Sequence, residues 1–304
     1  MMILIVGGTG ALGSATTEKL LAQKTAVRVM TRTPLKAQAL QALGAEVVQG
    51  DLRDQDSLIR ACQGVDVVLA SAHSIMGSGS ETSKYIDDQG HRWLIDAAKA
   101  AGVNHFVYVS ALGAAPDHPA NFFRIKYKIE QYLRNSGLPC TILRPTAFME
   151  SHAYQLIGQP ILETGKVTLF GKGENPRNFV AAADVAHFAV LMLLNPDPSG
   201  EMLAIGGTEN LTNMQVVVMY EELAGRKAKV SHVPLGMLRI MAPVVSPFNP
   251  GLSQVIQTSI WHDTTDQTFD PSTLLQRYPM TLTRLEDWTR SHIPSDRLVA
   301  AGSV

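Results

Sequence analysis

The chain has 304 residues, a formal net charge of −1, and 45% hydrophobic and 17% charged residues. A chain of this length can bury a full core, and its balanced charge gives no general attraction to nucleic acid or to an anionic membrane. The two cysteines, Cys62 and Cys140, exclude a disulfide framework and suit a reducing compartment. The histidines and cysteines show no metal-ligand spacing, so we expect no metal site.

The apolar segments bear on localisation. The first strand begins within three residues of Met1, which leaves no basic segment of the kind found in a secretory signal. The longest apolar stretches, 185–194 and 233–245, are shorter than the ~20 residues of a spanning helix, and we interpret both as core or pocket-lining segments. We therefore expect a cytoplasmic protein whose partners include neither a membrane nor a nucleic acid.

Strands and helices alternate through the first half of the chain. The first strand, Ile3–Val6, is followed by a glycine-rich turn and a helix from Ser14. In chain order we then predict a strand over 26–30, a helix over 35–43, a strand over 46–49, a helix over 57–62 behind the cap Asp56, a strand over 65–70, a helix over 85–101, a strand over 105–109, a helix over 121–135 and a strand over 140–143. This alternation predicts an α/β fold of the Rossmann type, a doubly wound parallel sheet with helices on both faces.

The glycine-rich turn is the strongest functional motif. Between the first strand and its helix stand Gly7, Gly8, Thr9, Gly10, Ala11, Leu12 and Gly13. Glycines allow the backbone to approach a ligand closely, and the free N–H groups of the helix start attract an anion. A strand, such a turn and a helix in this order predict a seat for a dinucleotide pyrophosphate.

We expect two parts in the chain. Beyond Pro145 the alternation loosens, and Gly and Pro become frequent. We assign residues 1–150 to the cofactor-binding Rossmann domain, with 178–206 returning to it. Residues 151–304 mainly form a smaller C-terminal subdomain, whose cleft is expected to take a small-molecule substrate.

The residues after the second strand select the dinucleotide. An Asp or Glu there would bind the ribose hydroxyls of NAD, but this chain has Thr31 and Arg32. A guanidinium pairs well with a 2′-phosphate, and Lys36 lies one turn further on, so we favour NADP (NADPH) over NAD. The alternative is that Arg32 is a solvated loop residue.

Asp51, after the third strand, either accepts a hydrogen bond from the adenine amino group or caps the following turn.

Further cofactor contacts are expected where other strands end, because ligands of such sheets lie beyond the carboxyl ends of the strands. These positions are Leu52, Ser71, Ala72, His73, Pro145, Ala147 and Phe148. Residues 74–80, rich in Gly and Ser, are either a flexible lid or an ordinary mobile loop.

Several segments together resemble a known family. The glycine turn, Gly50-Asp51-Leu52, 107–110, 143–150 and 178–186 are similar to the NmrA-like group of atypical short-chain dehydrogenase/reductases. This resemblance spans most of the chain. It implies NADP binding, and it covers both working NADPH reductases and proteins that bind NADP only to sense the redox state.

Typical members of the wider superfamily carry Tyr-x-x-x-Lys on one helix, where residues four apart share a face. Here Phe122 occupies the tyrosine position and Lys126 the lysine position. Lys126 is the candidate for binding the nicotinamide ribose and polarising a substrate oxygen. Ser110 is the candidate for a further donor, through its hydroxyl. The alternatives are that Lys126 is a surface lysine and that the Ser110 hydroxyl only forms a hydrogen bond with a nearby backbone group.

Three functions follow from this pattern. The leading hypothesis is an NADPH-dependent oxidoreductase that reduces a small carbonyl, quinone or enone. The missing phenol motivates the second, a non-catalytic NADP(H) sensor that signals to a regulatory protein partner. The third is a sugar-nucleotide epimerase, which Phe122 and Arg32 disfavour. An oligomer is compatible with each of them.

Overall fold

The computed structural model describes residues 1–195 and 200–293 and divides into two compact units. The first consists of Met1–Pro145, Ala182–Ala204 and Asn249–Gln254. The second consists of Thr146–Ala181, Ile205–Phe248 and the described part of Val255–Val304. The last residues of the predicted 151–304 part, 294–304, lie outside the described residues. The roles expected for the two parts, cofactor binding and substrate binding, stay predictions.

The first unit is built on a seven-stranded sheet in the order β10-β6-β5-β4-β1-β2-β3. Its strands are β1 (Met2–Val6), β2 (Ala26–Thr31), β3 (Glu46–Gln49), β4 (Val67–Ala70), β5 (His105–Val109), β6 (Cys140–Pro145) and β10 (Met202–Ile205). Neighbouring strands from β3 to β6 pair in parallel, and β1 is hydrogen-bonded between β2 and β4. The chain reverses its direction of winding at β1, so the switch point lies at the end of β1.

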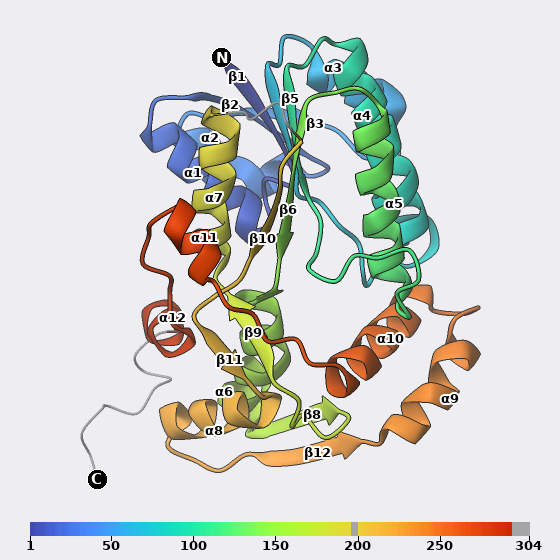
Figure 1. The fold of residues 1–304 in the computed structure, drawn as a ribbon, viewed down its shortest axis with the longest axis vertical. Coiled ribbons are helices and arrows are strands. Elements are labelled where there is room, and N and C mark those ends of the chain that lie inside the picture. The colour runs from blue at the N-terminus through green and yellow to red at the C-terminus, as the bar shows by residue number, and fades with distance from the viewer. Residues whose placement is uncertain (196–199, 294–304) are drawn as a thin grey trace. The chain divides into compact units, whose positions relative to one another are not determined.

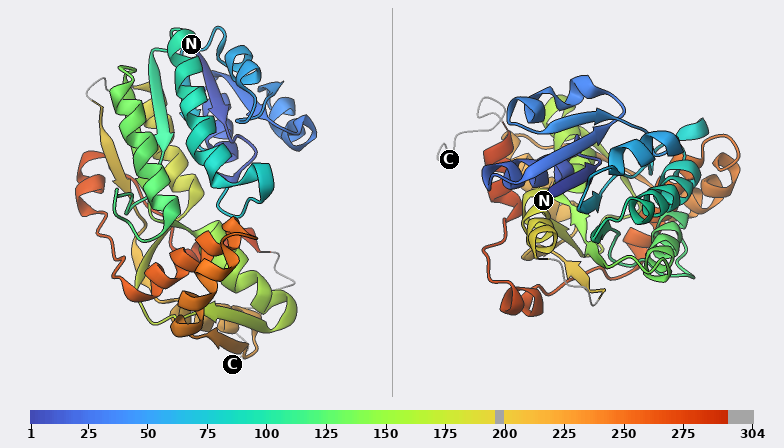
Figure 2. Two further views of the ribbon diagram at one scale, coloured as in Figure 1. Left: turned by 90° about the vertical axis from the view of Figure 1, so that its right-hand side faces the viewer. Right: turned by 90° about the horizontal axis from the view of Figure 1, so that it is seen from above.

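Helices cover both faces of this sheet, with α1, α2 and α7 on one side and α3, α4 and α5 on the other (Figure 1, Figure 2). Their bounds are α1 (Ala11–Ala22), α2 (Gln38–Ala42), α3 (Gln55–Cys62), α4 (His91–Ala100), α5 (Asn121–Asn135) and α7 (Ala182–Leu194). The central strand β5 is buried along its whole length, as expected for a strand covered on two faces. The predicted doubly wound Rossmann fold is confirmed.

Some predicted boundaries differ in the structure. Helix α3 is capped by Asp54, whose side chain accepts from two backbone N–H groups, and not by Asp56. The helix predicted over 35–43 begins as a 3-10 turn, η1 (Pro34–Ala37), because proline fixes its opening geometry. The helix predicted over 85–101 begins as a π-helical segment, η3 (Lys84–Gly90), and a short 3-10 turn, η2 (Gly79–Glu81), precedes it.

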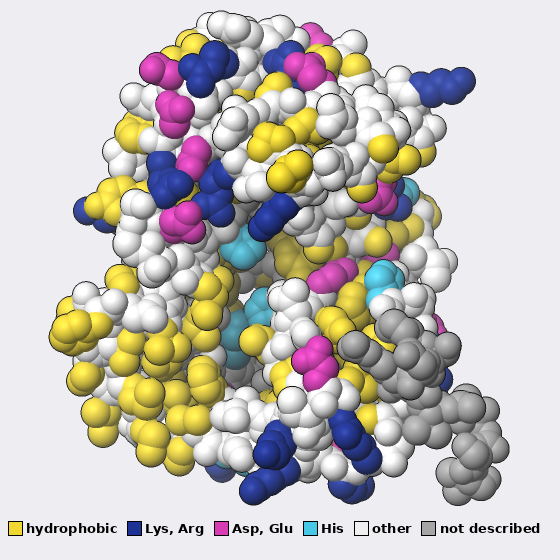
Figure 3. Space-filling view, turned by 180° about the vertical axis from the view of Figure 1, so that it is seen from behind, with side chains coloured by type: hydrophobic (Ala, Val, Ile, Leu, Met, Phe, Trp, Pro, Cys, Tyr) yellow, Lys and Arg dark blue, Asp and Glu magenta, His cyan; other side chains and the backbone are white. Residues whose placement is uncertain are grey.

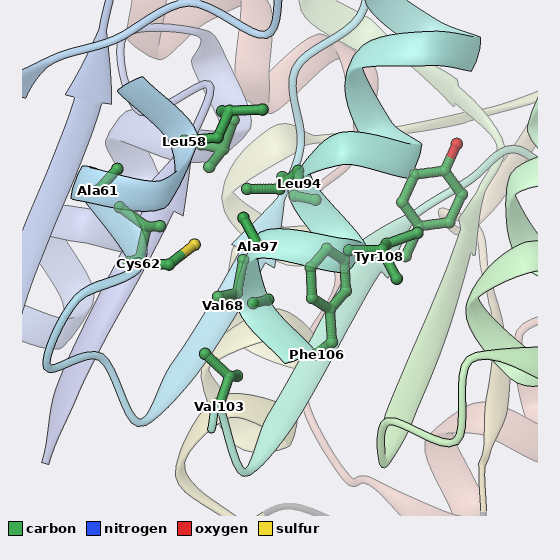
Figure 4. Packing of buried hydrophobic residues seen from close by; sticks show 14 of the residues in the cluster. Leu58, Ala61, Cys62, Val68, Leu94, Ala97, Val103, Phe106 and Tyr108 are labelled. Carbon is green, nitrogen blue, oxygen red and sulfur yellow. The ribbon is translucent and has the colours of Figure 1, made fainter. Parts of the chain in front are cut away.

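One large hydrophobic cluster fills the space between the sheet and helices α3 and α4. Leu58, Val68, Leu94 and Phe106 are fully buried in it, and Figure 4 shows them together. Tyr108 is the polar exception. Its ring belongs to the cluster, but its hydroxyl points away from the aliphatic side chains (Figure 4).

The second unit contains two small sheets. One has the order β11-β9-β7, and in the other β12 pairs in parallel with β8. The strands are β7 (Ala147–Phe148), β8 (Lys166–Phe170), β9 (Arg177–Val180), β11 (Glu209–Leu211) and β12 (Lys229–Val233). The helical segments, the first of which is a π-helix, are η4 (Met149–Gly158), α6 (Gln159–Thr164), α8 (Asn213–Ala224), α9 (Leu235–Val245), α11 (Ser272–Arg277) and α12 (Leu285–His292). Helix α10 (Pro250–Thr264) begins in the first unit and ends in the second.

The second unit has its own core, which includes Met149, Phe179 and Tyr220. The apolar stretch 233–245, predicted as a core or pocket-lining segment, contributes little to this core. This stretch contains the whole of α9, where Met237, Ile240 and Val244 are exposed and only Leu238 and Ala242 are buried. Figure 3 shows hydrophobic side chains gathered over this part of the surface. For the exposed face of α9, the interpretation of 233–245 as a core segment is therefore wrong, and the alternative of a pocket-lining segment stays a prediction.

Across the residues that the structure describes, none of the helices combines the length and the apolar character needed to cross a membrane.

Candidate dinucleotide site and its buried lysine

The glycine turn joins β1 to α1 and is held by its own backbone. Gly7 has a φ of +93°, and the N–H of Gly10 donates to its carbonyl over 3.0 Å. Thr9, Gly10 and Ala11 are exposed, whereas Leu12 and Gly13 are buried against the fold. Gly10 is the N-cap of α1 and contributes no side-chain hydrogen bond there. The first N–H groups of α1 are therefore available to an anion at the exposed tip of the turn.

The glycines of the turn differ in whether steric contacts within the fold require them. A Cβ on Gly13 would lie 2.3 Å from the carbonyl oxygen of Gly7, and a Cβ on Gly7 would lie 2.7 Å from the backbone nitrogen of Ala72. Both positions exclude any side chain. A Cβ on Gly10 would meet only the Gly7 carbonyl oxygen, at 3.4 Å. The fold itself therefore has room for a Cβ at position 10, and the contact of Gly10 with a pyrophosphate stays a prediction.

The residues predicted to select NADP follow β2. The Thr31 hydroxyl is turned inward and accepts from the backbone N–H of Thr33 at 3.2 Å. Arg32 is half-exposed, and its Nη1 donates to Oε1 of Glu81 over 2.6 Å. Lys36 is exposed in the η1 turn. A cationic group is thus present at the end of β2, and it already has an anionic partner.

Asp51 follows β3 and pairs with Arg53. Nη2 of Arg53 lies 2.6 Å from Oδ2 of Asp51, and the backbone N–H of Arg53 donates to Oδ1 over 2.9 Å. Hydrogen bonding to Arg53 holds the pKa of Asp51 below its usual value. Arg53 also lies 3.8 Å from Glu81, so Glu81 bridges two guanidinium groups. Leu52, between the two, is buried.

The segment after β4 leads toward the reacting end predicted for the cofactor. The Ser71 hydroxyl donates to the Val6 carbonyl over 3.0 Å, which ties the ends of β4 and β1 together. Ala72 is half-buried against Gly7, and His73 is exposed, with its ring 6.4 Å from that of Phe122. The backbone N–H of Ser74 then donates to the carboxylate of Asp87.

Lys126 is buried in α5, with 3% of its surface exposed. Its Nζ donates to the carbonyl of Val109 at the end of β5 over 3.0 Å, and it lies 5.6 Å from the centre of the Phe122 ring. Burial lowers the pKa of Lys126, while the carboxylates of Asp87 and Glu130 oppose that shift. The interpretation of Lys126 as a surface lysine is therefore wrong.

Ser110 lies next to Val109 and belongs to a buried polar network. Its hydroxyl donates to Oε1 of Glu130, a fully buried residue one helical turn beyond Lys126. Arg144 binds both oxygens of the same carboxylate, at 2.9 and 2.5 Å. The structure brings Ser110 and Lys126 to the same end of β5, but the hydroxyl hydrogen of Ser110 is directed to Glu130.

Two further polar groups are enclosed behind Lys126. The Tyr108 hydroxyl and Nε2 of His91 are buried and have no hydrogen-bond partner in the described part of the chain, and the two rings meet edge to face at 5.4 Å. Nζ of Lys126 lies 5.0 Å from the centre of the Tyr108 ring. Burial lowers the pKa of His91 to about 4 and raises that of Tyr108. Both side chains are neutral at physiological pH.

The structure places most of the predicted site residues at the carboxyl ends of β1 to β6. Pro145 ends β6 in the first unit, whereas Ala147 and Phe148 form β7 of the second unit. The sequence interpretation did not identify Glu81, Arg53 or Glu130. Glu130 had a local signal, because it lies four residues after Lys126 on the same helix face. Glu81 had none, since 49 residues separate it from Arg32.

A parallel sheet with its switch point at β1, an open glycine turn and an uncapped helix start define a dinucleotide-binding protein of the doubly wound class. The model of the NmrA-like family matches residues 1–286. The chain belongs to the NmrA-like family.

Three comparisons illustrate the range of similar proteins. The photosystem II assembly factor Ycf39 of Trieres chinensis is 28% identical over 299 residues, 95% of this chain and 91% of that protein. An NAD(P)H azoreductase of Xenophilus azovorans is 32% identical over 236 residues, 77% of this chain and 78% of that one. The crystal structure of an NADPH-dependent quinone oxidoreductase of Escherichia coli in complex with NADPH has a TM-score of 0.75 and 25% identity, covering 95% of this chain and 99% of that chain.

Proposed function

We propose that this protein is an NADPH-dependent oxidoreductase that reduces a small quinone, azo or carbonyl acceptor. The single observation that carries the proposal is the buried ammonium of Lys126 at the end of β5. One of its three donor positions binds the Val109 carbonyl, and the other two have no partner among the described residues. A buried cation with donor positions to spare suits a developing anion or a ribose hydroxyl.

The cofactor part of the proposal rests on the first unit. The glycine turn receives the pyrophosphate at the start of α1, and Arg32 with Lys36 receives the 2′-phosphate. The crystallised quinone oxidoreductase relative contains NADPH, and the azoreductase relative is named for NAD(P)H. Both support NADPH as the cofactor of this chain.

In the proposed reaction, NADPH held by the glycine turn and Arg32 would supply the hydride that reduces the acceptor, and the acceptor would take one proton as well. The protein excludes water behind Phe122 and Tyr108 and supplies the positive charge of Lys126 near the reduced atom. Lowering of the Lys126 pKa by burial eases release of a proton from Nζ. Ser110 acts through Glu130, which keeps a carboxylate one turn from Lys126.

The test is NADPH consumption by the purified protein with a panel of a benzoquinone, an azo dye and an aromatic aldehyde. Lys126→Ala is expected to lower kcat about 100-fold, the lower range for loss of a proton-transfer group. Lys128→Ala, an exposed lysine on the same helix, is the matched control and keeps the rate. An unchanged rate in Lys126→Ala removes this lysine from the mechanism.

A second function is favoured by Phe122 and by the assembly-factor relative. With Phe122 in place of the usual tyrosine, the protein would bind NADPH and NADP⁺ without turnover and signal which of the two is bound to a regulatory protein partner. Calorimetry with each form separates the two functions. A sensor binds the two forms with different affinities and consumes no NADPH with any acceptor, and equal affinities exclude it.

A further inference from the structure

Arg177 is a buried cation in the second unit. It opens strand β9 and is 5% exposed. Among the residues that the structure describes, no Asp or Glu carboxylate forms an ion pair with its guanidinium. Burial alone lowers its pKa to about 10, so the group still carries its charge at neutral pH. An unpaired buried charge costs several kcal/mol, which an anion at the guanidinium would offset.

The hydrogen bonds of the guanidinium are also incomplete. Its Nε is buried and has no hydrogen-bond partner within residues 1–195 and 200–293. Its Nη2 lies 3.5 Å from Nε2 of His262, a long contact, and the guanidinium carbon lies 5.1 Å from the centre of the Phe179 ring. An aromatic face and one neutral nitrogen do not replace a carboxylate.

His262 lies beside the Arg177 guanidinium. It is only partly buried, as are Trp261 and His152, whose rings lie 5.1 and 6.0 Å from the His262 ring. Nδ1 of His262 is hydrogen-bonded to the side-chain oxygen of Gln267, which can only accept, so Nδ1 carries a hydrogen. This bond fixes the ring and directs Nε2 toward the guanidinium.

We propose that the second unit binds the carboxylate group of an aromatic small molecule against Arg177, with the aromatic body of that molecule beside the His262 ring. One guanidinium supplies one positive charge, which matches a carboxylate, whereas a phosphate dianion would remain partly uncompensated. The planar guanidinium suits a planar carboxylate, and the neighbouring indole and imidazole rings suit an aromatic body. This inference goes beyond the proposed function and does not depend on it.

Calorimetry on the full-length protein tests the site with benzoate, and benzamide serves as the uncharged probe of the same shape. Benzoate is expected to bind, and benzamide to bind at least about tenfold more weakly, the loss expected for one charged hydrogen bond. Arg177→Met is expected to weaken benzoate by at least about the same factor. Arg239→Met, an exposed arginine of α9, is the matched control and leaves benzoate binding unchanged.

Three outcomes overturn the proposal: equal affinity for benzoate and benzamide, unchanged benzoate affinity in Arg177→Met, or displacement of benzoate by an equal concentration of chloride. If Arg177→Met does not fold, NMR of the unmodified protein decides. Benzoate then shifts the Arg177 Nε resonance and benzamide does not. The reverse pattern, or no shift with either probe, contradicts the site.

These measurements separate this site from the proposed reductase. NADPH affinity, followed by cofactor fluorescence, is expected to be the same in Arg177→Met and in the unmodified protein. Loss of benzoate binding with intact NADPH turnover contradicts the carboxylate site alone. Benzoate binding that depends on Arg177, in a protein that consumes no NADPH, contradicts the reductase and leaves the site standing.

Discussion

The guanidinium of Arg32 donates to the carboxylate of Glu81 over 2.6 Å, so the cation expected to receive a 2′-phosphate already holds an anion. Glu81 also lies 3.8 Å from Arg53. If Arg32 receives the 2′-phosphate as proposed, that phosphate competes with Glu81 for the guanidinium. The Arg32 and Glu81 side chains are both about half-exposed, so separating them costs little free energy.

Removing the competing carboxylate is expected to tighten NADPH binding. Exposed ion pairs contribute about 0 to 1 kcal/mol, so Glu81→Gln should lower the Kd for NADPH by up to about fivefold. NADH lacks the 2′-phosphate, and its Kd should not change. Fluorescence titrations of both cofactors at low ionic strength measure this. Weaker NADPH binding in Glu81→Gln would show that Glu81 assists the site and does not compete with it.

The glycine turn predicts opposite outcomes for two substitutions. Gly10→Ala is expected to fold normally, because the added Cβ meets only one atom, at 3.4 Å, and the φ of −84° suits alanine. It should weaken NADPH by at least about tenfold, since the methyl group occupies the approach of the pyrophosphate. Thermal unfolding and cofactor titration measure the two effects.

Gly13→Ala is the contrasting variant. Its Cβ would lie 2.3 Å from the Gly7 carbonyl oxygen, so we expect Gly13→Ala to lower the stability of the folded protein itself, even without cofactor. A Gly10→Ala protein that binds NADPH as tightly as the unmodified chain would place the pyrophosphate elsewhere.

Glu130 is expected to be the main stabilising group of the network around Ser110. Glu130→Gln removes the charge that faces Arg144 and should cost about 3 kcal/mol of unfolding free energy. Ser110→Ala removes one donor only and should cost about 1 kcal/mol. Urea unfolding of the two variants gives both values. A Glu130→Gln cost no larger than that of Ser110→Ala would mean that the Arg144 pair contributes little.

His91 is expected to make folding sensitive to mild acid. Burial lowers its pKa from 6.5 to about 4 in the folded protein, so between these values the unfolded chain binds a proton that the folded protein does not. This contribution to stability is complete above pH 6.5 and is lost as the pH falls toward 4, by about 3 kcal/mol in total.

His91→Gln should flatten this part of the stability profile. Urea unfolding between pH 4 and 7 measures the slope in the variant and in the unmodified protein. NMR titration of the His91 ring gives its pKa directly. A ring that titrates near 6.5 in the folded protein would contradict the expected effect of burial.

Local patterns predicted the fold and the frame of the site. Alternating apolar segments and the glycine turn predicted the strands, and the spacing on one helix placed Lys126 on the same face as Phe122. The same spacing rule could have identified Glu130, four residues further along. Ion-pair partners far apart in sequence could not be predicted, because nothing near Arg32 indicates Glu81. The prediction for 233–245 failed for another reason. Apolar composition does not say whether other elements of the fold pack against a given face of a helix.

Arg177 shows a related limit. It directly precedes the family-like segment 178–186, yet its residue type gives no sign that the fold encloses it. Its contact with His262 spans 85 residues, and its unusual property is the absence of a carboxylate partner among the described residues. Such a property exists only in three dimensions.

The packing of α1 against α7 has a consequence for synthesis of the chain. Helix α1 follows the first strand, but the helix that covers it is Ala182–Leu194, and most of α7 is buried. A nascent chain ending at Pro145 would contain the whole glycine turn and still leave this face of α1 uncovered. We therefore expect the ribosome to release a stable nucleotide-binding unit only after α7 has emerged, and fragments truncated before it to require chaperones.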